Sequence, residues 1–238
     1  NLAAVEEKYQ ALVATLPPEE QAWERTLQEN LGNFYLPIHK GERVKGSRNA
    51  WEFVKDDPKL PRVLIIGDSV SRGYTLAARD ALKGKANVHR APENCGPTAN
   101  GLKKLDIWLG TGKWDVIHFN FGIHDRATPP ADYEQRLEEI VLRLKKTGAK
   151  LVWASTTPIP ADEAKKQDPA SIVERNAIAA RVMEKHGVAV DDLFTMITPL
   201  LSQAQNSNDV HFNAAGYELL GKMVVQAVMD AAPRKAGN

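Results

Sequence analysis

From Pro61 onward, short apolar runs alternate with amphipathic stretches. The apolar runs predict buried strands at 63–67, 87–90, 116–121, 151–155 and 188–190. The stretches that follow them predict helices at about 70–83, 97–109, 131–147, 169–186 and 214–231. Apolar strands that each lead into a helix favour a parallel sheet covered on both faces. We therefore predict a three-layer α/β/α sandwich with about five parallel strands.

The first 60 residues follow another pattern. Helical spacing of apolar residues predicts one helix over 2–16 and a second from Pro18 to about Leu31. The basic stretch "LPIHKGERVKGSRNAW" is predicted to be irregular. We expect residues 1–60 to form an N-terminal helical extension and linker packed on a main domain over 61–238. The alternative is that residues 1–60 form a partner-binding arm or a disordered N-terminal segment.

Composition narrows the class of protein. A chain of 238 residues suits one large α/β domain, and 43% hydrophobic content is enough for a sizeable core. The formal net charge of +1 argues against nucleic acid and anionic membranes as partners. No apolar run approaches the roughly 18 residues that span a bilayer. Cys95 is the single cysteine, so an intrachain disulfide is excluded.

The sequence begins at Asn1 rather than at a methionine. If a leader was removed before this residue, a periplasmic or secreted location is favoured. The single cysteine fits the cytoplasm as well as the periplasm, and the oligomeric state is left open.

The first predicted strand ends on Gly67-Asp68-Ser69-Val70. In open parallel sheets, ligands bind beyond the carboxyl ends of the strands. Ser69 would lie at a helix N-terminus, where free backbone N–H groups and the helix dipole favour an alkoxide or an oxyanion. The alternative is that Asp68 or Ser69 only caps the helix.

Two further segments follow strand ends. In "NCGPT", Gly96 would bring its backbone N–H close to a substrate, or it is a plain turn glycine. In "FNFGIHDR", His124 is a hydrogen-bond donor, a base or a buried histidine. His118 lies earlier on the same strand, about 20 Å away, which is too far for the two rings to share a metal.

The segment "SNDVHFNAAGYELL" places Asn208, Asp209 and His211 just before the last predicted helix. A serine hydroxyl needs a base near neutral pH. The histidine that serves as this base needs a partner on its other ring nitrogen. His211 lies on a short loop beside an amide and a carboxylate, so it can serve as this base and has a partner for its other ring nitrogen.

These four segments, in this order, resemble the motif blocks of the SGNH hydrolases, also called the GDSL esterase/lipase superfamily. The blocks are Gly67-Asp68-Ser69, Gly96, Gly122-Ile123-His124-Asp125 and Asn208-Asp209-Val210-His211, and the likeness covers roughly residues 61–231. The resemblance implies a flavodoxin-like strand order and an acyl-enzyme on Ser69, with His211 as base. It also implies an oxyanion hole from the backbone N–H groups of Ser69 and Gly96, and no metal or organic cofactor.

Two positions depart from the family pattern. His124 stands where the family has an oxyanion asparagine; a histidine N–H can donate instead, and Asn120 is a weaker substitute. Asn208 stands where the family has the acid. We favour Asn208 as the residue that orients His211, with Asp209 as rival, because neighbours on an extended loop point in opposite directions. Additional candidates for substrate contact are Asp68, Asn120 and Asp125.

The expected substrate is a small ester or an oligosaccharide ester, because "ENCGPT", "FNFGIHD" and "NDVHF" are similar to bacterial SGNH proteins that de-esterify carbohydrates. Trp108, Trp114 and Trp153 either stack on sugars or pack in the core. Loops 126–131 and 156–168 are candidates for specificity. The alternatives are a non-catalytic binding protein on this scaffold, an acyltransferase, or an enzyme acting on a non-acyl ester.

Overall fold

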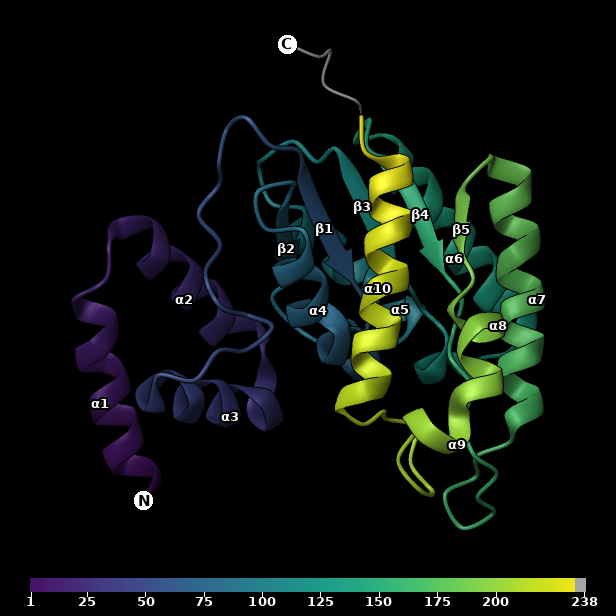
Figure 1. Cartoon of the computed structure of the whole chain (residues 1–238), viewed down its shortest axis with the longest axis horizontal. Helices are drawn as coiled ribbons and strands as arrows, with labels where there is room; N and C mark the ends of the chain where they lie inside the picture. The colour runs from purple at the N-terminus through teal and green to yellow at the C-terminus, as the bar shows by residue number, and fades with distance from the viewer. Residues whose placement is uncertain (234–238) are drawn as a thin grey trace.

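Five parallel strands form the central sheet of the computed structural model, which describes residues 1–233 (Figure 1). The strands are β1 (Arg62–Ile66), β2 (Asn87–Arg90), β3 (Val116–Phe119), β4 (Lys150–Ala154) and β5 (Ala189–Asp191). Their spatial order is β2-β1-β3-β4-β5, and each pair is parallel. This order is the flavodoxin-like one, so the predicted fold class is confirmed.

Helices cover both faces of the sheet. They are α4 (Ser69–Ala81), α5 (Thr98–Leu109), α6 (Pro130–Lys145), α7 (Pro169–His186) and α10 (Ala214–Ala231). Alternation along β1 fills both cores: Val63 and Ile65 pack with α4 and α10, whereas Leu64 and Ile66 pack with α5, α6 and α7. Two short helices, α8 (Leu193–Ile197) and α9 (Leu201–Ala204), and the 3₁₀ turns η1 (Ile123–Asp125) and η2 (Thr198–Leu200) complete the main body.

The N-terminal extension holds three helices, α1 (Leu2–Ala14), α2 (Pro18–Asn30) and α3 (Gly32–Lys45). The prediction of an irregular stretch is therefore wrong up to residue 45. Pro37 inside α3 weakens the helical signal, because proline lacks an N–H donor. Tertiary contacts compensate: the fully buried Glu24 accepts hydrogen bonds from Tyr9 Oη (2.6 Å) and His39 Nε2 (2.8 Å).

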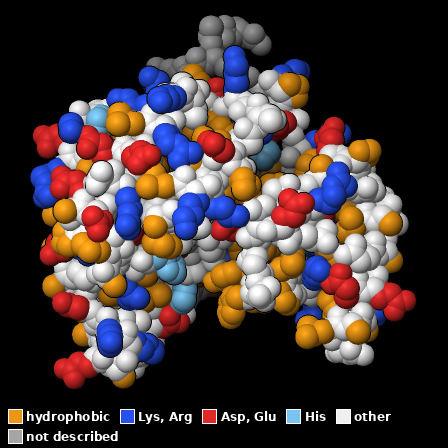
Figure 2. Space-filling model, turned by 180° about the vertical axis from the view of Figure 1, so that it is seen from behind, with side chains coloured by type: hydrophobic (Ala, Val, Ile, Leu, Met, Phe, Trp, Pro, Cys, Tyr) orange, Lys and Arg blue, Asp and Glu red, His pale blue; other side chains and the backbone are white. Residues whose placement is uncertain are grey.

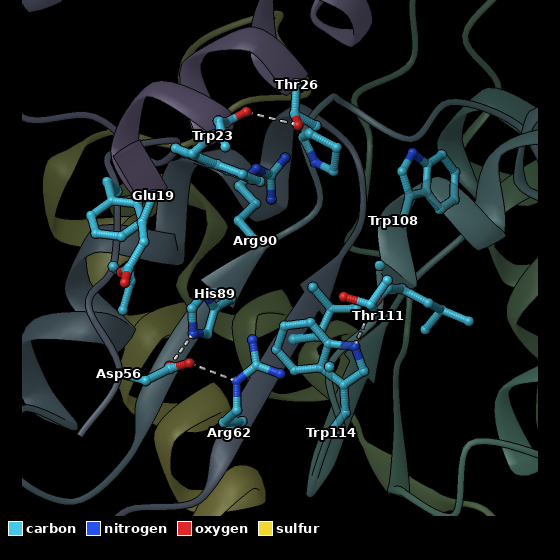
Figure 3. A pocket seen from close by; sticks show the side chains of 18 of the residues that line it. Glu19, Trp23, Thr26, Asp56, Arg62, His89, Arg90, Trp108, Thr111 and Trp114 are labelled. Carbon is cyan, nitrogen blue, oxygen red and sulfur yellow. Dashed lines mark hydrogen bonds and ion pairs between the residues drawn. The ribbon is translucent and has the colours of Figure 1, made fainter. Parts of the chain in front are cut away.

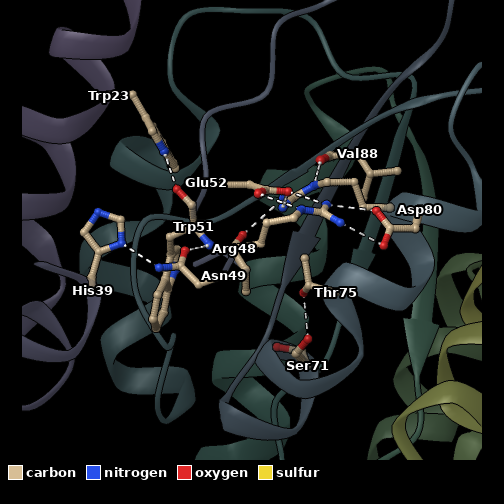
Figure 4. Close-up of polar contacts among 12 residues, drawn as sticks. Trp23, His39, Arg48, Asn49, Trp51, Glu52, Ser71, Thr75, Asp80 and Val88 are labelled. Carbon is tan, nitrogen blue, oxygen red and sulfur yellow. Dashed lines mark hydrogen bonds and ion pairs between the residues drawn. The ribbon is translucent and has the colours of Figure 1, made fainter. Parts of the chain in front are cut away.

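The linker after α3 runs along β2, the edge strand of the sheet. The Arg79 guanidinium donates from Nε to the Val88 carbonyl (2.9 Å) and from Nη2 to the Ala50 carbonyl of the linker (3.1 Å). Asn87 exchanges two hydrogen bonds of 2.9 Å with the backbone of Asp57. Figure 4 shows the linker beside this edge. The division of the chain at residue 60 into two domains stays a prediction.

The surface carries interspersed acidic and basic side chains on the face seen in Figure 2. A notch separates the extension from the main body at one end of that face. Within residues 1–233, no helix is long and apolar enough to cross a bilayer.

Candidate active site

Ser69 is the first residue of α4 and directly follows the turn after β1. Asp68 is the N-cap of this helix, and its side chain accepts from the Val70 N–H at 2.9 Å. Gly67 is required here, since a Cβ at this position would lie 2.6 Å from Ser71 Oγ. The sequence therefore folds into a tight strand–turn–helix unit that leaves Ser69 half-buried at the carboxyl edge of the sheet.

Ser69, His211 and Asp209 form a hydrogen-bonded chain. Ser69 Oγ lies 2.8 Å from His211 Nε2, and His211 Nδ1 lies 2.7 Å from Asp209 Oδ1. An ionised carboxylate only accepts hydrogen bonds, so Nδ1 carries the proton and Nε2 presents its lone pair to the Ser69 hydroxyl. This is the arrangement of a nucleophile, a general base and an orienting acid.

The preference for Asn208 as the orienting residue is contradicted by this geometry. The loop is a turn rather than an extended segment: Asn208 has φ +53°, and the His211 N–H donates to Asp209 Oδ1 at 3.2 Å. In such a turn neighbouring side chains no longer alternate, and Asp209 reaches the ring two positions ahead. The Asn208 backbone carbonyl instead accepts from Lys165 Nζ (3.3 Å).

The charge on Asp209 is stabilised locally. Partial burial favours the neutral acid, but hydrogen bonds from the backbone N–H and ring of His211 outweigh it and lower the Asp209 pKa. The carboxylate therefore stays ionised at neutral pH, as a group that stabilises an imidazolium must.

The two predicted backbone donors of the oxyanion hole lie on adjacent turns. The Cys95 N–H donates to the Gly67 carbonyl (3.0 Å), which brings the loop of Gly96 alongside the nucleophile turn. Within residues 1–233, the N–H groups of Ser69 and Gly96 donate to no protein acceptor. Gly96 has φ +68°, a conformation that favours glycine. Both N–H groups are thus free for an oxyanion, and His124, exposed in η1, stays a predicted third donor.

Three predicted substrate contacts have partners inside the protein. Asp68 caps α4, as described above. Asn120 Nδ2 donates to the Ala154 carbonyl and Thr156 Oγ1, both at 2.9 Å. Asp125 is fully buried and accepts from the Thr98 N–H (2.9 Å) and hydroxyl (2.7 Å). These side chains hold the turns in place, and their contact with substrate stays a prediction.

Arg90, at the end of β2, is a residue that the sequence analysis missed. Its guanidinium is almost fully buried and donates to Ser71 Oγ (2.7 Å), the Asp68 carbonyl (3.0 Å) and Asn94 Oδ1 (2.6 Å). Within the described residues it forms no ion pair, and burial lowers its pKa. It ties the nucleophile turn to the loop of Gly96. The signal that could have found it is a charged residue at the end of a predicted buried strand.

The remaining sequence candidates occupy structural positions. His118 is buried and pairs with Asp191 across the sheet (2.8 Å), and Trp153 is in the core. Loop 156–168 reaches the His211 loop, because Gln205 Nε2 donates to the Pro158 carbonyl (2.8 Å). Among residues 1–233, no group of three or more metal-ligating side chains comes together.

Comparison with known proteins agrees with this geometry. Residues 65–219 match the GDSL-like Lipase/Acylhydrolase family. A lipase/acylhydrolase from Enterococcus faecalis has 22% identity and a TM-score of 0.64, covering 74% of this chain and 100% of its own. An acetylxylan esterase from Geobacillus stearothermophilus has 14% identity and a TM-score of 0.61, covering 71% and 94%. At these TM-scores and low identities, the likeness to the two structures shows a common fold. No curated protein sequence matches the chain.

Proposed function

The chain belongs to the GDSL-like Lipase/Acylhydrolase family, and on this premise we propose that it is a serine ester hydrolase that forms an acyl-enzyme on Ser69. The observation that carries the proposal is the 2.8 Å contact between Ser69 Oγ and His211 Nε2, with Asp209 on the other ring nitrogen. A histidine so oriented removes the proton that otherwise keeps a serine hydroxyl unreactive.

In the proposed reaction, Ser69 Oγ attacks the ester carbonyl while His211 takes its proton. The carbonyl oxygen becomes an oxyanion, held by the N–H groups of Ser69 and Gly96, with His124 as a further donor. When the tetrahedral intermediate collapses, the bond to the alcohol breaks and His211 gives its proton to that alcohol. Water, activated by His211, then attacks the acyl-enzyme, releases the carboxylic acid and restores Ser69.

The proposed substrate is an acetylated carbohydrate or another small ester. Support comes from two structural neighbours named as acetyl xylan esterases, one of which has 15% identity and a TM-score of 0.62 over 70% of this chain and 99% of its own. Because sequence identity is low, this part of the proposal rests on analogy. The half-exposed side chains of His211 and Asp209 (40% and 43%) fit a site open to a large substrate.

The first experiment treats the protein with a p-nitrophenyl phosphonate and measures mass gain on Ser69. We expect one adduct per chain and release of acetate from acetylated xylo-oligosaccharides. Ser69→Ala should show neither. Folded wild-type protein that takes up no phosphonate and hydrolyses no ester would favour a non-catalytic binding protein instead.

Acyl transfer is the second candidate function, since an alcohol can replace water in deacylation. Hydrolysis of p-nitrophenyl acetate would be followed with and without a sugar acceptor. Acetate as the sole product supports the hydrolase, whereas acetylated acceptor as the main product supports a transferase.

A further inference from the structure

A cavity of about 680 Å³ lies where the extension meets the sheet edge (Figure 3). Its walls come from α2, the linker, the β1–β2 edge, α5 and the loop before β3. Ser69, Asp209 and His211 do not line it. Its α2 and linker walls lie outside residues 65–219, the part that matches the family. The volume falls within the range of small-molecule sites, about 300–1,000 Å³.

Two half-buried tryptophans, Trp23 and Trp114, give this cavity apolar faces, and the buried Trp108 backs its wall. Trp23 approaches from α2, and Trp108 and Trp114 stand across the hollow from it (Figure 3). Each indole N–H is already satisfied: Trp23 donates to the Trp51 carbonyl (2.7 Å), Trp108 to Glu93 (3.0 Å) and Trp114 to the Leu109 carbonyl (2.9 Å). The ring orientations are therefore fixed, and what these side chains offer a ligand is carbon surface.

Several charged groups of the cavity are paired with one another. Asp56 binds Arg62 Nε (2.9 Å) through one oxygen and His89 Nε2 (2.6 Å) through the other. The Arg62 guanidinium also stacks on Trp114, 4.1 Å from the ring centroid. A polyanion would have to compete with Asp56 for these cations. Neutral hydroxyl groups would not, since they both donate to carboxylates and accept from guanidinium groups.

One buried donor remains without a protein partner. Arg90, 2% exposed, lines the inner wall, and its Nε has no hydrogen-bond acceptor among the described residues. This N–H is itself buried, so the surface that the cavity offers a ligand comes from the tryptophan rings and the Asp56–Arg62–His89 group.

We propose that this cavity binds a segment of a neutral oligosaccharide, separately from the catalytic serine. Sugar rings present C–H faces to the indoles and hydroxyls to the Asp56–Arg62–His89 group. The site does not depend on the esterase proposal, because binding here needs no chemistry at Ser69.

The test measures binding by calorimetry on Ser69→Ala, in which no ester turnover can interfere. The probes are xylohexaose, cellohexaose and, as a charged sugar of equal length, hexagalacturonate. We expect a neutral hexasaccharide to bind more tightly than hexagalacturonate. Trp114→Ala removes one aromatic face, and Thr111→Trp fills the exposed rim without removing a core contact; each should weaken binding at least tenfold.

Phe34→Ala is the matched control, because Phe34 is 71% exposed on α3 and does not line the cavity. This variant should bind like its parent. Absence of binding by both neutral probes, tighter binding of hexagalacturonate, or neutral binding unchanged in both cavity variants would overturn the proposal. Hydrolysis of p-nitrophenyl acetate by Trp114→Ala with Ser69 intact should equal wild type, so failure of the esterase proposal is scored separately.

Discussion

Asp209 Oδ1 accepts two hydrogen bonds from one residue, the ring Nδ1 of His211 at 2.7 Å and its backbone N–H at 3.2 Å. The same oxygen thus fixes the loop and orients the imidazole. A change at Asp209 is expected to affect the tautomer of His211 directly, because an amide can present a donor where the carboxylate only accepts.

Asp209→Asn should lower kcat by roughly 10²- to 10⁴-fold, since the amide neither fixes the tautomer nor stabilises an imidazolium. Asn208→Gly is the neighbouring control and should change kcat less than threefold, because glycine also adopts φ +53° and the Asn208 side chain makes no hydrogen bond within the described residues. The kcat values of the two variants, measured on any ester that the wild type hydrolyses, decide which residue orients His211. A severe loss in Asn208→Gly alone would identify Asn208 as the residue that orients His211.

Ser69→Ala and His211→Ala should each reduce kcat by several orders of magnitude, and the double variant should lose little more. The reason is that the two side chains act as one unit through their 2.8 Å contact. Single-turnover rates of the three variants test this. Losses that multiply would contradict the pairing.

Arg90→Met should lower kcat about tenfold or more while KM changes little, because the guanidinium positions the nucleophile turn and the Gly96 loop. Arg79→Met is the matched control: this buried arginine binds Val88 and the linker instead. It should reduce thermal stability and spare kcat in the folded protein. Equal kcat in the two folded variants would refute a positioning role for Arg90.

Glu24 makes the extension sensitive to acid. Burial raises the pKa of this carboxyl, but the hydrogen bonds from His39 and Tyr9 outweigh burial, and the pKa lies below its ordinary 4.5. A lowered folded-state pKa contributes stability above pH 4.5, which is lost as the pH falls through the folded value. The protection factors of α2 amides, which are corrected for the intrinsic pH dependence of exchange, should therefore fall below about pH 4.5. Glu24→Gln should exchange faster at neutral pH and respond less to acid.

Strands β1, β3 and β4 were predictable because each is mostly an apolar run. Strand β2 was predicted with its observed bounds although only Val88 of its four residues is apolar. Helix α3 was not, since Pro37 hides its pattern and its stability comes from contacts with α1 and α2 that are distant in sequence. Ser69 could be identified from the sequence because it follows a predicted strand, and His211 because it comes just before the last predicted helix. Whether Asn208 or Asp209 orients His211 depends on the turn in the backbone at this loop. The only sign of that turn in the sequence is Asn208 itself, because asparagine tolerates positive φ.

The contact between Arg79 and the Val88 carbonyl has a consequence for self-association. The backbone N–H groups of Asn87 and Ala91 donate to the chain of β1. The backbone N–H and C=O groups of Val88 therefore point to the other side of β2, which has no neighbouring strand within residues 1–233. An unprotected strand edge is a template on which another molecule can add a strand. The arginine and the linker bound to it occupy that edge, so the N-terminal region shields the β2 edge of the sheet from intermolecular pairing.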